Sequence, residues 1–203
     1  MRRIVVAVSL LASSLAGNAL ADGIGGRLGV FGKAGLAVPV QDDFISGTSK
    51  TKIAFITGGG LIYGITDSLA AEMDVSHAPS LDVETAGVKT FKGSLTDISL
   101  GVQYRFSPDK PVVPYLGIGA DFITGELEHA VTGNKYDLEW TPGGHINAGV
   151  DYFITKGIAL TADVRGIVAV KGDIKRGDSK VGNFDPASFQ ATFGVRLFLP
   201  SKL

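Results

Sequence analysis

Apolar and polar residues alternate along eight stretches of this chain. Because successive side chains of a strand point to opposite faces, such a period of two predicts β-strands with one apolar face each. In one stretch the apolar face holds Ile146, Ala148, Val150, Tyr152 and Ile154, and the polar face holds His145, Asn147, Gly149 and Asp151. The eight predicted strands are residues 26–39, 51–63, 68–78, 94–106, 113–125, 141–154, 157–171 and 187–199.

The segments between these strands alternate in length. Residues 64–67, 107–110 and 155–156 are short and rich in turn formers, whereas residues 40–50, 79–93, 126–140 and 172–186 are longer and polar. Short turns at one end and long loops at the other are typical of outer-membrane barrels, whose periplasmic turns are short and extracellular loops long. The sequence therefore predicts an all-β fold, an eight-stranded antiparallel transmembrane β-barrel.

A soluble barrel with its apolar rows inside is the alternative interpretation. Two features favour the membrane. The polar rows mix both charge signs with glycine and hold few of the Lys and Glu residues that cover a soluble surface. Aromatic residues also gather near the short turns, which predicts an interfacial girdle rather than core aromatics. These are Tyr63, Tyr104, Phe106, Tyr115, Tyr152, Phe153 and Phe198.

The first 21 residues have the composition of a secretory signal peptide. A basic Met1-Arg2-Arg3 start precedes an apolar segment, and Ala19-Leu20-Ala21 forms a small-residue cleavage site. That apolar segment is shorter than the roughly 20 residues a membrane-spanning helix needs, so an uncleaved anchor is the weaker interpretation. We expect residues 1–21 to be the leader and residues 22–203 to be the barrel domain.

The charge balance and the residue types limit the function. Without the leader's two arginines, 17 basic side chains face 20 acidic ones, which argues against a nucleic-acid partner. The chain has no cysteine, so disulfides and thiolate metal sites are excluded. No histidine spacing predicts a metal site, and no nucleophile motif is present. We expect no cofactor, no catalytic residues and no enzyme activity.

The polar face of the predicted strands carries charged residues into a narrow interior. An eight-stranded barrel is only wide enough for side chains to fill it. Unpaired charges would be costly there, so we expect paired networks. The charged residues expected in this lumen are Glu72, Asp97, Arg105, Asp121, Asp151, Asp163, Arg165 and Arg196, and Asp74 lies on the same face.

Four segments resemble the outer membrane protein W family, which includes the alkane-uptake protein AlkL. VVPYLGIGADF (112–122) and GGHINAGVDYFI (143–154) resemble its fifth and sixth strands, and FDPASFQATFGVRLFL (184–199) resembles the passage into its last strand. TKIAFITGGGLIYGITDSLAAEMDVSHAP (51–79) is similar to its second and third strands. Such barrels usually end on an aromatic residue, but this chain continues past Phe198 to Leu203. We therefore expect either that the assembly machinery recognises residues 189–199 or that insertion is less efficient.

The resemblance implies a bacterial outer-membrane protein that admits small hydrophobic molecules and releases them sideways through its wall. It places Trp140 at the passage, with Ile53 and Phe55 as gate residues. Its implied partners are outer-membrane lipid, the barrel-assembly machinery and small hydrophobic molecules. Trp140 is equally well explained as an interfacial anchor. Two alternatives remain: a closed structural or surface-interaction barrel, and a lipid A-modifying enzyme using a histidine such as His77 with Ser76 and Asp74.

Overall fold

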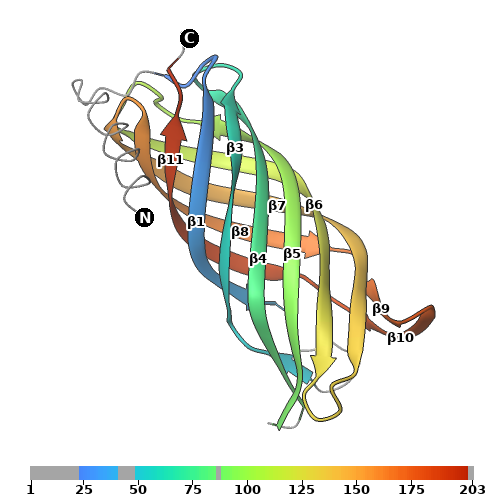
Figure 1. Ribbon diagram of the computed structural model, residues 1–203. Helices are drawn as coiled ribbons and strands as arrows, with labels where there is room; N and C mark the ends of the chain where they lie inside the picture. The colour runs from blue at the N-terminus through green and yellow to red at the C-terminus, as the bar shows by residue number, and fades with distance from the viewer. Residues whose placement is uncertain (1–22, 41–48, 86–87, 201–203) are drawn as a thin grey trace, which may run out of the picture.

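The computed structural model describes residues 23–40, 49–85 and 88–200, and these form a closed antiparallel barrel of eight strands (Figure 1). The barrel strands are β1 (Leu28–Pro39), β3 (Ala54–Gly64), β4 (Leu69–Thr85), β5 (Val88–Arg105), β6 (Val112–His129), β7 (Lys135–Thr155), β8 (Ile158–Ala169) and β11 (Ser188–Phe198). Three short strands stand outside this ring: β2 (Ser49–Thr51), β9 (Gly172–Arg176) and β10 (Ser179–Phe184). The predicted leader, residues 1–21, lies outside the described residues.

Antiparallel pairing of neighbouring strands closes the ring. β1 pairs with β3 on one side and with β11 on the other, while β8 pairs with both β7 and β11. Closure leaves a sheet no free edge, which is how strands satisfy their backbone groups inside lipid. The predicted eight-stranded fold is confirmed. Within the described residues, no helix has the length and apolar character to cross a membrane.

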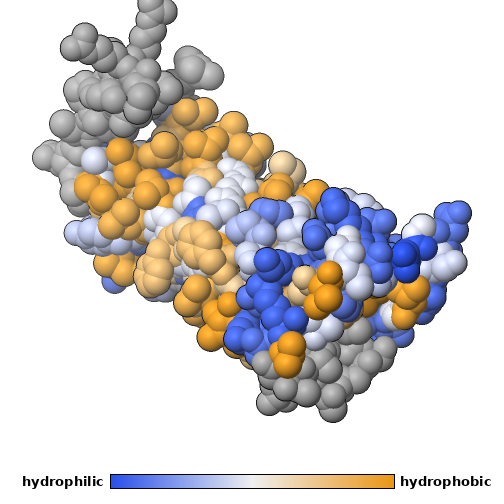
Figure 2. Space-filling model, turned by 60° about the horizontal axis from the view of Figure 1, so that its bottom comes forward, coloured by the Kyte–Doolittle hydropathy of each residue, from blue (hydrophilic) through white to orange (hydrophobic). Residues whose placement is uncertain are grey.

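The apolar rows of the strands face outward, as the alternation predicts. On β7 the outward side chains of Ile146 and Tyr152 are 68% and 52% exposed, whereas the inward side chain of Asp151 is fully buried. Figure 2 shows hydrophobic surface over the body of the barrel, and hydrophilic residues gathered toward the end where β9 and β10 lie. This distribution gives the barrel a lipid-facing band and a polar end.

The prediction of an aromatic girdle on the outer surface is correct for some of the named residues and wrong for the others. Tyr63, Tyr104, Phe106 and Tyr152 are exposed near the short turns, but Tyr115, Phe153 and Phe198 are buried inside the barrel. Tyr152 and Phe153 are consecutive, and strand alternation must send one of them inward. The rings of Phe153 and Phe198 stack with centroids 5.7 Å apart. They belong to an apolar cluster that fills the short-turn end of the lumen: Ile24, Phe31, Ile62, Ala70, Val113, Phe153, Ala159 and Phe198.

Three of the predicted long loops are largely strand. β4 and β5 continue through most of residues 79–93, and β6 and β7 through most of residues 126–140. Residues 172–186 form the β9–β10 hairpin, which pairs with β7 at Asp137 and Leu138. These extensions pack around a second apolar cluster of Val83, Leu127, Leu138, Ile174 and Phe184. Polar residues cover the outside of these strand extensions, which is why the sequence predicted loops. The inward positions, at every second residue, are nevertheless apolar.

A salt bridge also fastens the hairpin to the barrel extension. Lys175 Nζ lies 2.7 Å from Glu139 Oε1. This hydrogen bond, together with the carboxylate charge, raises the pKa of Lys175 above its ordinary value. Because both groups are exposed, the pair contributes less to stability than the buried apolar cluster beneath it.

The short turns form where they were predicted, and side-chain hydrogen bonds hold two of them. Thr66 Oγ1 accepts a hydrogen bond from the Leu69 backbone N–H at 3.0 Å. Thr155 Oγ1 accepts one from the Ile158 backbone N–H at 3.1 Å. In the third turn Ser107 adopts a φ of 51°, the left-handed conformation that tight turns use. The turns set the register of the strand pairs that bring lumen residues together.

Candidate binding site in the lumen

A network of charged side chains crosses the middle of the lumen. Arg105 Nη2 lies 2.8 Å from Asp151 Oδ2, and Arg196 Nε lies 3.3 Å from Asp151 Oδ1. Arg196 Nη2 also lies 3.0 Å from Glu72 Oε2. Arg165 Nη2 lies 3.6 Å from Glu72 Oε1. Five of the eight predicted lumen charges therefore form one connected network of buried ion pairs.

Residues absent from the predicted charge set complete this network. Gln103 Nε2 donates a hydrogen bond to Glu72 Oε2 at 2.6 Å. Lys33 Nζ on β1 forms an ion pair with Asp74 Oδ2, and Arg165 Nη2 lies 3.4 Å from the same oxygen. Lys33 alternates with the outward Leu36 and Val38 of β1, and this period of two was the sequence signal for its inward side chain.

The other three predicted charges have separate surroundings. Asp163 Oδ2 accepts hydrogen bonds from Tyr115 Oη at 3.0 Å and from Asn147 Nδ2 at 2.8 Å. Asp121 Oδ1 lies 2.8 Å from His145 Nδ1. Asp97 is buried, but neither of its carboxylate oxygens has a hydrogen-bond partner in the described barrel. The network thus extends toward Asp163 through Tyr115, which accepts a 3.3 Å hydrogen bond from Arg196 Nη2.

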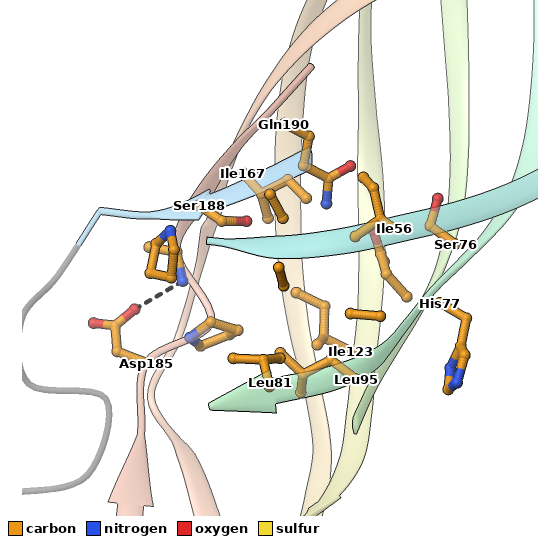
Figure 3. A pocket seen from close by; sticks show the side chains of 17 residues that line it. Ile56, Ser76, His77, Leu81, Leu95, Ile123, Ile167, Asp185, Ser188 and Gln190 are labelled. Carbon is orange, nitrogen blue, oxygen red and sulfur yellow. Dashed lines mark hydrogen bonds between the residues drawn. The ribbon is translucent and has the colours of Figure 1, made fainter. Parts of the chain in front are cut away.

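An apolar pocket lies in the lumen on the side of the charge network away from the short turns. Figure 3 shows Ile56, Leu81, Leu95, Ile123 and Ile167 converging on it from five strands. Ala54, Ile56, Ala78 and Leu81 form an apolar cluster there, with Ala37 and Leu95 packed against it. The pocket encloses about 580 Å³, its open mouth included.

The wall of the barrel is interrupted beside this pocket. β3 pairs with β4 from Thr57 opposite His77 to Gly64 opposite Ala70, and the pairing of β2 with β4 begins at Thr51 opposite Val83. Across the intervening described positions, residues 53–56 and 78–81, the β3–β4 ladder is missing. Pro79 lies at this break, and it has no backbone N–H to donate to a ladder.

The pocket reaches the wall at this interruption. Ala54 and Ile56 line it from β3, and Ala78 and Leu81 line it from β4. His77 also lines it, although the His77 side chain is exposed on the outside of the barrel. Each interrupted strand keeps its other neighbour, since Phe55 pairs with Leu36 of β1 and Ala78 pairs with Leu95 of β5. The pocket therefore lies beside a stretch where β3 and β4 lack ladder pairs with each other, although each strand remains paired with its other neighbour.

The residues that the resemblance implied for a passage lie on the outer surface. Trp140, Ile53 and Phe55 are 56%, 62% and 53% exposed, and none of the three lines the pocket. Strand alternation explains this for β3, because Ala54 and Ile56 take the inward positions on either side of Phe55. Sequence reasoning therefore missed the pocket-lining residues, whose small or aliphatic side chains carry no distinctive signal.

His77 does not form a catalytic group with Ser76 and Asp74. Ser76 Oγ donates a 2.9 Å hydrogen bond to Asp74 Oδ1 inside the lumen, but His77 Nδ1 lies 3.0 Å from Thr96 Oγ1 on the outside. Strand alternation separates these consecutive residues. Among the described residues, no three His, Cys, Asp or Glu side chains are grouped to hold a metal ion.

Comparison with known proteins identifies the class of barrel. The model of the outer membrane protein beta-barrel domain family matches residues 7–196 of this chain. No curated protein matches the sequence.

Several solved structures share the fold. The outer membrane protein OprG from Pseudomonas aeruginosa is 16% identical with a TM-score of 0.65, and the match covers 86% of this chain and 97% of OprG. For Neisserial surface protein A these values are 19%, 0.61, 87% and 99%. For E. coli outer membrane protein W they are 15%, 0.53, 86% and 98%. The last similarity agrees with the family resemblance drawn from the sequence.

Proposed function

This chain belongs to the outer membrane protein beta-barrel domain family, and we propose that it admits small hydrophobic molecules across the bacterial outer membrane, in which it resides. The observation that carries the proposal is the apolar pocket beside the interruption between β3 and β4. A molecule that enters this pocket meets aliphatic side chains and lies beside the unpaired stretch of the wall.

The interior of the barrel favours a sideways route. Beyond the pocket, buried ion pairs of Arg165, Glu72, Arg196 and Asp151 cross the lumen. Past them, the apolar cluster around Phe153 and Phe198 fills the short-turn end. An apolar molecule moving straight through would have to disrupt both layers, and breaking a buried ion pair costs about 3–5 kcal/mol. Leaving between β3 and β4 avoids that cost.

Uptake into proteoliposomes tests the proposal. We expect vesicles that carry the protein to take up a small apolar probe faster than protein-free vesicles. Ala78→Phe places an aromatic ring in the pocket. Because the close-packed wall cannot move aside, the ring occupies the space that a probe would use, and the uptake rate should fall at least about threefold. Ala71→Phe is the matched control, since it makes the same change on the outward face of β4.

Two results would contradict the proposal: uptake no faster than in protein-free vesicles, or equal rates for the two phenylalanine variants. Trp140→Ala belongs in the same assay. If Trp140 controls a passage, its removal changes the uptake rate, whereas an interfacial anchor leaves the rate of the inserted barrel unchanged.

A closed barrel that acts through its surface is the second candidate. The observation that favours it is the extension of β4 to β7 beyond the lipid-facing band, with its own apolar cluster. Such an extension presents a rigid surface outside the cell rather than loose loops. The uptake assay separates the two functions, because a purely surface-acting barrel gives no probe uptake above the protein-free level.

A further inference from the structure

Asp97 differs from the other predicted lumen charges, because the described barrel gives its carboxylate neither an ion pair nor a hydrogen bond. Its side chain comes from β5, lines the apolar pocket and is only 7% exposed. Neither carboxylate oxygen has a hydrogen-bond partner. Leaving a buried carboxylate without a partner is costly. Its lumen neighbours Asp74 and Asp121 each have a basic partner, Lys33 and His145.

A second unsatisfied acceptor faces the same pocket from the opposite wall. Gln190 of β11 lines the pocket, and its Oε1 is buried without a hydrogen-bond partner. Figure 3 shows the Gln190 amide directed toward the pocket. A carboxylate and an amide oxygen both accept hydrogen bonds. A hydrogen-bond donor bound in the pocket could satisfy both groups.

The charge of the pocket narrows the choice of donor. Its lining contains no lysine or arginine. The acidic residues on it are Asp97 and Asp185, and Asp185 Oδ1 already accepts a 3.1 Å hydrogen bond from the Ala187 backbone N–H. His77, the remaining ionisable lining residue, lies with Nδ1 3.0 Å from Thr96 Oγ1. A hydroxyl group would supply a single hydrogen-bond donor, whereas an ammonium group supplies three donors and a positive charge.

We propose that the pocket binds an amphiphile with a primary ammonium head and an apolar body. The head lies between Asp97 and Gln190, and the body packs against Ile56, Leu81 and Leu95. An ammonium group has three donors, enough for the carboxylate and the amide oxygen together. This assignment rests on the proposed function for the apolar pocket and adds the class of molecule that the pocket selects.

Binding to the full barrel in lipid nanodiscs tests the head group. The probes are hexylammonium, hexanol and hexanoate, titrated calorimetrically near neutral pH, with empty nanodiscs subtracted for partitioning into lipid. We expect hexylammonium to bind at least about tenfold more tightly than hexanol, as charge-assisted hydrogen bonds contribute that much. Asp97→Asn should bring the two affinities together. Asp137→Asn, the same change at an exposed site on β7, should keep the preference.

The outcomes separate this proposal from the function it rests on. If all three probes bind alike, or if Asp97→Asn keeps the ammonium preference, the head-group assignment is wrong while the apolar pocket stands. If no probe binds, the pocket and the proposed function both fail. If Asp97→Asn loses heat-modifiable migration on a gel, Gln190→Leu replaces it and should weaken hexylammonium binding about fivefold. Unchanged hexylammonium binding in Gln190→Leu would then overturn the assignment.

Discussion

Asp151 joins two arginines of the charge network. It is fully buried and faces two guanidinium groups, those of Arg105 and Arg196. The Arg196 guanidinium also lies over the rings of Phe31 and Tyr115, each at 5.2 Å from the ring centroid. Arginine can satisfy this mixture of partners because its planar cation both pairs with carboxylates and stacks on aromatic faces.

We expect Asp151→Ala to destabilise the barrel by about 3–5 kcal/mol, because it leaves two buried guanidinium groups without their shared carboxylate. Urea unfolding from lipid vesicles measures this change. Asp109→Ala in an exposed short turn is the control and should stay within about 0.5 kcal/mol of the parent. Equal stability of the two variants would mean that the network does not hold the barrel together.

For a single residue, the sequence predicts whether the side chain points into the lumen, but it does not predict which residue that side chain contacts. Alternation along a strand indicates that Glu72 and Arg196 point inward, but it does not indicate that they meet. Their meeting depends on the register of β4 and β11 around the closed barrel, and register follows from turns and side-chain packing on all strands. Asp97 illustrates this limit, since it was expected in the network and lies in the pocket instead.

Among the elements, the barrel extension differs most from expectation. The predicted loops were polar stretches. Their outward residues, such as Lys92, Glu128 and Lys135, are charged, and this made the alternation of a β-strand difficult to recognise in the sequence. The inward residues, such as Val83 and Leu127, still alternate and pack together. The membrane-spanning parts were predictable because lipid requires an apolar outer face, and no such requirement applies where the strands leave the membrane.

We expect Phe184→Ala to loosen this extension without affecting the spanning barrel. Phe184 is 1% exposed, and removing such a ring costs about 3–5 kcal/mol of local stability. Limited proteolysis should cut the extension faster, while heat-modifiable migration of the barrel persists. Val181→Ala, at a 53% exposed position of β10, serves as the control. If Phe184→Ala is cleaved no faster than Val181→Ala, the apolar cluster does not hold the hairpin.

The lumen of the whole barrel contains three layers. The apolar cluster with Phe153 and Phe198 lies at the short-turn end, the charge network lies in the middle, and the apolar pocket lies beyond it. The narrow interior was predictable from the number of strands. The order of the layers was not, since it depends on which inward positions fall at the same height on strands far apart in sequence. Phe153 and Phe198 show this, as both were expected on the outer girdle.

This stacking predicts a barrel that does not conduct ions. We expect planar bilayers containing the protein to carry the same salt current as protein-free bilayers, because the apolar cluster with Phe31, Phe153 and Phe198 disfavours water and ions at the short-turn end of the described lumen. A wide porin inserted in the same bilayer shows that conductance is detectable. Stable step currents from this protein alone would show that this cluster is open or mobile.

The interrupted ladder between β3 and β4 also bears on how deep the barrel sits. Unpaired backbone N–H and C=O groups are costly in hydrocarbon, so we expect the unpaired stretch at residues 53–56 and 78–81 to lie among the lipid headgroups. From Thr57 to Tyr63 the paired strands present outward residues such as Leu61 to lipid. The position of this stretch along the barrel would then indicate how deeply the protein sits in the outer leaflet.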